Sequence, residues 1–407
     1  MIGRKRKRET MQHVVYLDNA ATTYPKPRRV IQATAQSLTV CGGNPGRGTH
    51  RLAMASERLL FQTRKELADF FYTEPELVIF TPNATQAINT ALKGVAFSLF
   101  QTGTIPHILI SDMEHNAVYR PVASLAARRW ASYSVFSTFP TEISPNTDAI
   151  MDGIRRKYRP NTKILVCAHS SNIVSSTLPI GEIGAFCRRH DIFLIVDAAQ
   201  SAGHEEIDME RDSIDALCLP GHKGLYGPMG CGALLFSPSG VRRLPLLSTL
   251  MEGGNGYRSL DDAMGEELPE RLEAGTPPTP AVAGLSEGIR FVRSIGLSHI
   301  RQKESDLFAE ASEILRRFPA VRIISPSKSG SILSFRVDGV DSERVADELS
   351  MRNICVRAGY HCTALGHRTL GTTDGGTVRL SFGVLNREQD ILDFGAAMRD
   401  FLPRGIV

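Results

Sequence analysis

Two residues that could carry chemistry end or follow short apolar runs in the middle of the chain. Asp197 ends the run at residues 192–197, and Lys223 follows the run at residues 216–219 among several glycines. A carboxylate in that place either caps a loop or pairs with a ligand cation. Lys223 is either an ordinary loop lysine or an amine that loses its proton when removed from water and forms a Schiff base. Because ligands of open α/β sheets gather at the carboxyl ends of the strands, both residues are candidates for one site.

Polar residues follow other apolar runs as well. Ala84 and Thr85 start a predicted helix, where backbone N–H groups and a hydroxyl can bind a phosphate, although simple N-capping is the commoner use of such a start. His115 and Asn172 follow the next two runs. A phosphate-binding helix start, a ring-sized histidine, a strand-end acid and a loop lysine together require a ligand with a phosphate, an aromatic ring, a basic ring nitrogen and an aldehyde. Pyridoxal 5′-phosphate has all four groups.

Other motifs that would indicate a different chemistry are absent from the sequence. No zinc-ligand spacing, phosphate-binding P-loop or nucleophile elbow occurs, and the glycines at 227, 230 and 232 do not form the dinucleotide-binding fingerprint. The sequence therefore predicts no metal site and no nicotinamide cofactor.

Short apolar runs alternate with amphipathic stretches, which is the pattern of an α/β protein. The predicted strands are residues 77–81, 107–111, 163–168, 192–197, 216–219 and 232–237. The predicted helices between them include residues 84–93, capped by Gly94, and residues 180–190. This order of elements favours one large, mainly parallel sheet with helices on both faces.

The character of the chain changes at residues 251–280, which are rich in glycine and proline. Helical patterns follow at residues 281–318 and 342–352, and strand patterns at residues 331–337 and 377–383. We therefore predict three parts, namely a basic disordered tail at residues 1–12, a large domain at residues 13–265 and a smaller α+β domain at residues 281–407. The first residues of the large domain are candidates for packing on the smaller one.

Composition narrows the class of protein. The 407 residues are 42% hydrophobic and 22% charged, which is near the average for globular proteins. Five basic residues and one acidic residue among the first ten account for the net charge of +4, so the rest of the chain has no excess charge that calls for nucleic acid. The basic run is either a solvated tail or an arm for nucleic acid or a membrane surface.

The seven cysteines are scattered without a CxxC pair, and no apolar stretch reaches the roughly 20 residues of a membrane-spanning helix. This use of cysteine favours buried thiols in a reducing compartment. We therefore expect a cytoplasmic protein without a membrane segment.

Several motifs resemble one family over nearly the whole chain after the tail. They include Gly221-His222-Lys223 and Arg357-Ala358-Gly359-Tyr360-His361-Cys362, together with residues 43–50, 113–116, 196–203 and 273–277, and the match extends from residues 16–23 to residues 379–383. The chain resembles the cysteine desulfurases among the class V aminotransferase-like enzymes. The resemblance implies the type I fold of pyridoxal-phosphate enzymes, with a large domain whose mainly parallel sheet lies between helices and a smaller α+β C-terminal domain that carries Cys362.

The resemblance implies a role for each matched residue. Lys223 would hold the cofactor covalently and move a proton during the reaction, Asp197 would pair with the ring nitrogen, and His115 would stack on the ring. The remaining implied contacts are Ala84, Thr85 and His222 to the phosphate, Gln200 to the ring oxygen, and Asn172, Arg379 and Arg357 to the substrate carboxylate or its surroundings. Thr276 would reach the phosphate of a neighbouring subunit, which implies a homodimer.

Cys362 distinguishes desulfuration from transamination in this interpretation. A single cysteine is commonly an inert small hydrophobe, but its place directly after His361 in the motif favours a nucleophile. The implied reaction converts L-cysteine into L-alanine and leaves the sulfur on Cys362 as a persulfide for a sulfur acceptor. The alternatives are a selenocysteine lyase acting on L-selenocysteine, a class V aminotransferase, a β-eliminating lyase, and a sulfur-relay scaffold without enzymatic activity.

Overall fold

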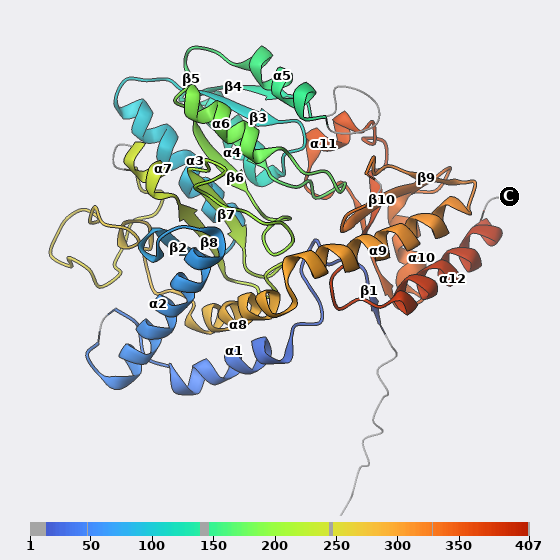
Figure 1. Ribbon diagram of the computed structural model, residues 1–407, viewed down its shortest axis with the longest axis horizontal. Coiled ribbons are helices and arrows are strands. Elements are labelled where there is room, and N and C mark those ends of the chain that lie inside the picture. Colours follow the sequence, from blue (N-terminus) through green and yellow to red (C-terminus); the bar gives the residue numbers. More distant parts are fainter. Residues whose placement is uncertain (1–13, 47, 139–145, 244–246, 328, 406–407) are drawn as a thin grey trace, which may run out of the picture.

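The computed structural model describes residues 14–46, 48–138, 146–243, 247–327 and 329–405. A seven-stranded sheet with the strand order β2-β8-β7-β6-β5-β3-β4 forms its larger part, in the left half of Figure 1. The strands are β2 (Val78–Thr81), β3 (His107–Ser111), β4 (Ser132–Phe136), β5 (Thr162–Ala168), β6 (Phe193–Asp197), β7 (Ala216–Pro220) and β8 (Gly232–Phe236). Neighbours from β4 to β7 are parallel, and β8 is antiparallel to both β2 and β7. The predicted α/β class with a mainly parallel sheet is confirmed.

Helices cover both faces of this sheet because successive side chains of each strand point to opposite sides. In β5, Leu165 and Cys167 join one hydrophobic core, whereas Ile164 and Val166 join the other. The first core is closed by α2 (Arg51–Phe71), α5 (Thr147–Lys157), α6 (Ile180–Arg189) and α8 (Thr279–Ile295), and the second by α3 (Ala84–Gln101) and α4 (Asn116–Ala127). Helix α1 (Arg28–Val40) packs on α8, and the short α7 (Pro238–Arg243) follows β8.

Helix α3 is longer than predicted. The prediction that Gly94 ends it is wrong, because the helix continues through Gly94 to Gln101. A Cβ at Gly94 would lie 3.0 Å from the carbonyl oxygen of Ser248, so the glycine allows the helix to pack closely against that segment. The glycine therefore serves packing and does not terminate the helix.

The C-terminal part has its own antiparallel sheet with the order β12-β13-β10-β9, at the right of Figure 1. Its strands are β9 (Val321–Ile323), β10 (Ile332–Val337), β12 (Arg357–Gly359) and β13 (Thr377–Ser381). The helices of this part are α9 (Leu297–Arg316), α10 (Ser342–Ser350), the short α11 (Ala364–Thr369) and α12 (Glu388–Gly405). Phe308, Phe335 and Phe394 lie in the centre of its hydrophobic core.

The N-terminal segment joins this C-terminal part. Strand β1 (Val15–Tyr16) pairs in parallel with β11 (Ile354–Cys355), and Val15 and Leu17 are buried in the C-terminal core. Helix α8 instead packs on α1 and α2. The domain limits 13–265 and 281–407 stay a prediction, and the predicted tail at 1–12 lies outside the described residues. Among the helices of the described residues, none has the length and apolar character needed to cross a membrane.

Candidate active site

One pocket collects most of the residues predicted to bind the cofactor. It lies at the carboxyl ends of β5, β6 and β7 and beside the first turns of α3 and α4. Its wall includes Ala84, Thr85, His115, Asn172, Asp197, Gln200, His222 and Lys223. The fold therefore brings together residues as far apart in the sequence as Ala84 and Lys223, as expected for the carboxyl edge of an open sheet.

The start of α3 forms the polar end of this pocket. The side chain of Asn83 caps the helix by accepting a hydrogen bond from the backbone N–H of Gln86 at 2.9 Å, so Ala84 and Thr85 lie in the first turn. His222 lies opposite, and its Nδ1 atom is buried without a hydrogen-bond partner among the described residues. The positive end of the helix dipole and the unpaired ring nitrogen fit an anion such as a phosphate.

Lys26 adds a cation that the sequence analysis missed. Its Nζ atom donates to the carbonyl oxygen of His222 and to the hydroxyl of Thr23, both at 2.7 Å. Burial lowers the pKa of Lys26 to about 8. Since Lys26 stands between two prolines and belongs to no motif, only the folded chain reveals that it supports the polar end of the pocket.

Lys223 and Asp197 face the middle of the pocket. Lys223 is half-buried after β7, and its amine has no hydrogen-bond partner among the described residues. Burial lowers the pKa of Lys223 to about 8, against the attraction of Asp197. Asp197 is 3% exposed at the end of β6 and accepts a hydrogen bond from the N–H of Ala199 at 2.9 Å. An amine that deprotonates near neutral pH and a buried acid fit the aldehyde and the ring nitrogen of pyridoxal phosphate.

His115 has a neutral ring at the start of α4. Burial, followed by the charge of Lys223, lowers the pKa of His115 to about 4. Its Nδ1 atom accepts a hydrogen bond from the N–H of Ala117 at 3.0 Å, which leaves the proton on Nε2. A neutral, oriented imidazole at the wall of the pocket fits stacking on an aromatic cofactor.

A buried arginine forms the next part of the site. Arg379 is 2% exposed, donates to the carbonyl oxygen of Asn172 at 2.9 Å and pairs with Asp18 at 2.8 Å, while its Nε atom has no partner among the described residues. Burial lowers the pKa of Arg379 despite the charge of Asp18. Arg357 lies directly opposite Arg379 on the neighbouring strand and is exposed. The two guanidinium groups suit a carboxylate ligand.

Cys362 lies in the loop between β12 and α11 and is exposed. Its carbonyl oxygen accepts a hydrogen bond from the N–H of Asn116 at 2.7 Å. Because Asn116 directly follows His115, this bond holds the cysteine loop against the segment that lines the cofactor pocket. The same chain thus supplies both the predicted nucleophile and the predicted cofactor pocket at one location.

Thr276 is the predicted cofactor ligand that does not line this pocket. It is exposed in the segment after Glu273, whose carboxylate pairs with Arg64 at 2.6 Å and accepts from the N–H of Phe80 at 2.5 Å. The buried pair fixes the base of the segment while Thr276 points to the surface. Gln200 does line the pocket, and its Nε2 atom donates to the carbonyl oxygen of Ala20 at 3.1 Å.

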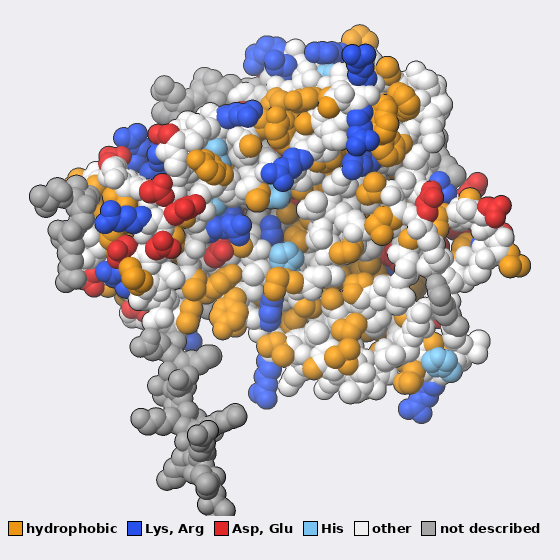
Figure 2. Space-filling view, turned by 180° about the vertical axis from the view of Figure 1, so that it is seen from behind, with side chains coloured by type: hydrophobic (Ala, Val, Ile, Leu, Met, Phe, Trp, Pro, Cys, Tyr) orange, Lys and Arg blue, Asp and Glu red, His pale blue; other side chains and the backbone are white. Residues whose placement is uncertain are grey.

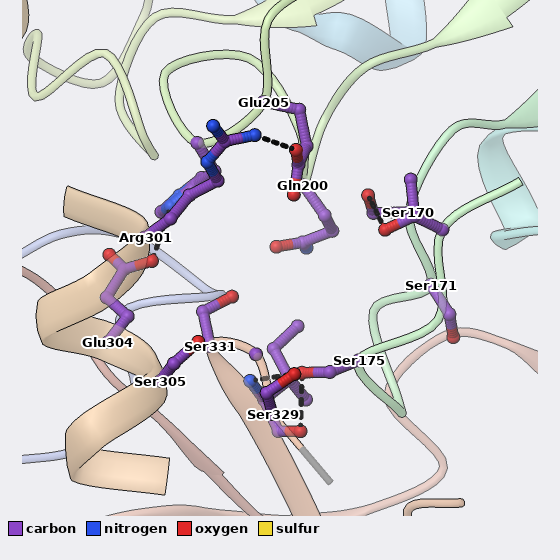
Figure 3. Close-up of a pocket in the computed structure, with 14 residues that line it drawn as sticks. Ser170, Ser171, Ser175, Gln200, Glu205, Arg301, Glu304, Ser305, Ser329 and Ser331 are labelled. Carbon is purple, nitrogen blue, oxygen red and sulfur yellow. Dashed lines mark hydrogen bonds and ion pairs between the residues drawn. The ribbon is translucent and has the colours of Figure 1, made fainter. Parts of the chain in front are cut away.

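A second cavity adjoins the pocket and shares Ser170 and Gln200 with it (Figure 3). Serine hydroxyls dominate its wall, and Arg301 and Glu205 form an ion pair at 3.0 Å at its edge. It lies between the loop after β5, helix α9 and the residues that precede β10. The active-site pocket therefore continues toward the junction with the C-terminal part.

Fold and site define an enzyme of the type I fold that uses pyridoxal phosphate. The family model described as aminotransferase class-V matches residues 15–394, and the chain belongs to this family. It is 30% identical over 391 residues to a probable cysteine desulfurase of Xylella fastidiosa, covering 95% of this chain and 90% of the relative. It is also 30% identical to a probable cysteine desulfurase of Methanothermobacter thermautotrophicus, covering 96% and 95% of the two chains.

A solved structure agrees with the sequence relatives. The apo structure of the cysteine desulfurase from Thermococcus onnurineus superimposes with a TM-score of 0.85 at 28% identity, over 97% of this chain and 95% of that chain. The family, the fold, the enzyme class and the pyridoxal phosphate cofactor expected from the sequence motifs are therefore confirmed.

Proposed function

We propose that the protein is a cysteine desulfurase that converts L-cysteine into L-alanine and takes up the sulfur on Cys362. The observation that carries the proposal is the hydrogen bond from Asn116 to the Cys362 carbonyl, because it keeps the loop with this exposed cysteine against a segment that lines the cofactor pocket. The similarity to proteins named cysteine desulfurase supports the same activity.

The residues around the pocket divide the work on the cofactor and the amino group. Pyridoxal phosphate, when bound, supplies an electron sink that weakens the bonds at the amino acid's Cα and Cβ. Lys223 would hold the cofactor through its aldehyde and, as a free amine, would move the proton at Cα. Asp197 would keep the ring nitrogen protonated, and His115 would pack on the ring. The lowered pKa of buried Lys223 suits its role, because the neutral amine is the reactive form.

The two polar ends of the pocket suit the two anionic groups, namely the cofactor phosphate and the substrate carboxylate. Ala84, Thr85 and His222 would hold the cofactor phosphate at the start of α3, and Gln200 would bind the ring oxygen. At the other end, Arg379 and Asn172 bind the substrate carboxylate, and exposed Arg357 adds positive charge beside them. A carboxylate between two guanidinium groups is held both by charge and by directed hydrogen bonds.

Sulfur transfer is the step assigned to Cys362. The C–S bond of L-cysteine breaks, and an S–S bond forms with the Sγ atom of Cys362. L-Cysteine and the Cys362 thiol thus become L-alanine and a Cys362 persulfide, and the atoms and electrons balance without an external oxidant. A thiol of a separate sulfur acceptor then removes the outer sulfur atom.

We propose a homodimer in which Thr276 completes the cofactor site of the neighbouring subunit. Large apolar side chains are exposed on α1 and α2, including Ile31 at 58%, Leu38 at 66%, Val40 at 61% and Phe61 at 54%. Figure 2 shows that apolar side chains are also common over the middle of one face of the molecule. Exposed apolar surface of this kind is typical of protein–protein interfaces. The seven cysteines, all within the described residues and all unpaired, support a cytoplasmic location.

The test is to add L-cysteine to the purified holoenzyme and to a Cys362→Ala variant. The holoenzyme is expected to release L-alanine and to gain about 32 Da, the mass of one sulfur atom, on the Cys362 peptide. The variant is expected to lose L-alanine formation but to keep the cofactor absorbance band at about 420 nm. A Cys41→Ala variant is the matched control and is expected to retain both L-alanine formation and the absorbance band. Pyruvate and ammonia as products would indicate a β-eliminating lyase instead.

A further inference from the structure

The side chain of Asn172 is bonded to both neighbours of Cys362. Its Nδ2 atom donates to the carbonyl oxygen of His361 at 2.7 Å, and its Oδ1 atom accepts from the hydroxyl of Thr363 at 2.6 Å. Asn172 is 8% exposed and Thr363 is fully buried, so water does not compete for these bonds. One amide group therefore connects the substrate-carboxylate site to the loop that carries the sulfur-accepting thiol.

The loop needs such contacts because of its backbone conformation. His361 and Cys362 have φ angles of 48° and 58°, in the left-handed region that residues with a Cβ seldom adopt. Two further bonds hold the turn, one between His361 Nε2 and the Thr377 hydroxyl at 2.9 Å, the other from Asn116 to the Cys362 carbonyl at 2.7 Å. A turn of this kind persists only while the surrounding contacts hold it, and it relaxes when they are lost.

The hydroxyl of Thr363 also determines which way the Asn172 amide faces. Because a hydroxyl hydrogen points at Oδ1, the NH2 group lies on the opposite side, where one N–H reaches His361 and the second N–H has no partner within the part of the chain that the structure describes. A rotated amide would present its oxygen to the substrate carboxylate and repel it. We propose that Thr363 is a positioning residue that orients Asn172 and thereby couples carboxylate binding to closure of the Cys362 loop.

This inference rests on the proposed function, in which Asn172 and Arg379 bind the substrate carboxylate. The Asn172 amide bonds both to the substrate carboxylate and to the loop residues His361 and Thr363. Each set of bonds therefore stabilises the other, and the coupling between substrate binding and loop closure is reciprocal. A bound amino acid holds Cys362 next to the pocket, where the sulfur leaves the substrate. Departure of L-alanine removes the added stabilisation that the bound carboxylate gives to the Asn172 bonds, so the strained turn opens more readily and Cys362 can meet the sulfur acceptor.

The experiment compares Thr363→Val with Thr363→Ser in the holoenzyme. Valine matches the shape of threonine without its hydroxyl, serine keeps the hydroxyl, and Thr369→Val on exposed Thr369 of α11 is the control. One readout is the rate at which iodoacetamide alkylates Cys362, followed by the mass of its peptide. The other is the affinity for L-alanine and for ethylamine, which lacks the carboxylate, followed by the cofactor absorbance.

Thr363→Val is expected to raise the alkylation rate about tenfold and to weaken L-alanine binding about tenfold, the effect of losing roughly one hydrogen bond. Ethylamine binding stays unchanged, and Thr363→Ser and Thr369→Val behave like the original protein. An unchanged alkylation rate in Thr363→Val, or an equal loss of affinity for both amines, overturns the coupling. Unchanged L-alanine affinity in an Asn172→Ala variant overturns the carboxylate role itself, which separates the two failures.

Discussion

The Nη2 atom of Arg379 lies 2.8 Å from the Oδ1 atom of Asp18, and this ion pair links the N-terminal segment to the C-terminal sheet. Both side chains are largely buried, at 3% and 18% exposure. The pair compensates the charge of Arg379, and the bond from Arg379 to the Asn172 carbonyl at 2.9 Å fixes the same guanidinium from another side. The orientation of the predicted carboxylate site therefore depends on a residue at the opposite end of the chain.

Replacing Asp18 with Asn is expected to lower the free energy of unfolding by about 3 kcal/mol, because it leaves a buried guanidinium without its counter-charge. Urea denaturation of the holoenzyme measures the change. The control is Asp374→Asn, which removes an exposed partner of Arg336 and is expected to change the stability far less, because water screens an exposed ion pair. Equal stability losses in the two variants would contradict a structural role for the buried pair.

Capture of the cofactor by apoenzyme is expected to speed up with rising pH and to level off above about pH 8. The neutral amine is the form that attacks an aldehyde, and burial lowers the pKa of Lys223 to about 8. Below that pH the rate falls roughly tenfold per pH unit, as for a single titrating group. Stopped-flow absorbance after mixing apoenzyme with pyridoxal phosphate measures the rate. A rate that keeps rising beyond pH 10 would show an ordinary lysine.

Glu114→Gln is expected to stabilise the protein at alkaline pH. Burial raises the pKa of Glu114 to about 8, against the hydrogen bonds from Ser111 and Ala168. The folded state therefore favours the protonated acid, and this contribution is complete below the ordinary pKa of 4.5 and is lost as the pH rises through about 8. Glutamine imitates the protonated acid at every pH. Urea unfolding of both proteins at pH 5 and at pH 9 should show the larger gain at pH 9, and a gain independent of pH would contradict the shifted pKa.

A double substitution of Leu38 and Val40 by Glu on α1 is expected to separate the proposed homodimer into monomers. The two side chains are 66% and 61% exposed. Two carboxylates without counter-charges are costly to bury in an interface. Sedimentation velocity measures the mass, and dialysis measures how fast the cofactor is lost, which should increase if Thr276 of one subunit supports the other site. Leu392→Glu, on α12 at 50% exposure, is the control. A dimer that survives the double substitution would place the interface elsewhere.

The pocket was predictable from the sequence because its residues follow apolar strands that sequence patterns reveal. Asp197 and Lys223 were singled out from the ends of two such runs, and the structure places both at one pocket. Strand β4 escaped notice because Ser132 and Ser134 interrupt its apolar pattern and most of its side chains are only partly buried. A continuous apolar run identifies a strand whose two faces are both covered, and β4 at the edge of the sheet has no such run.

The contacts of Lys26, Asp18 and Thr363 were not predictable, since none of them leaves a local signal. Lys26 bonds to the carbonyl of His222, and Thr363 bonds to Asn172, in each case across about two hundred residues of sequence. Hydrogen bonds to a backbone carbonyl or between two uncharged side chains impose no periodicity. Such partners become visible only when the strands have been assembled in space.

The pairing of β1 with β11 has a consequence for how the chain acquires its structure during translation. Val15 lies opposite Ile354, so the first strand leaves the ribosome long before its hydrogen-bonding partner exists. Pairing across such a separation carries a high entropic cost and comes late in folding. The sheet of seven strands can assemble while synthesis continues, whereas the part bearing Cys362 must wait until the ribosome has nearly finished. A nascent chain that stalls before residue 354 would hold a formed cofactor pocket without the thiol that completes it.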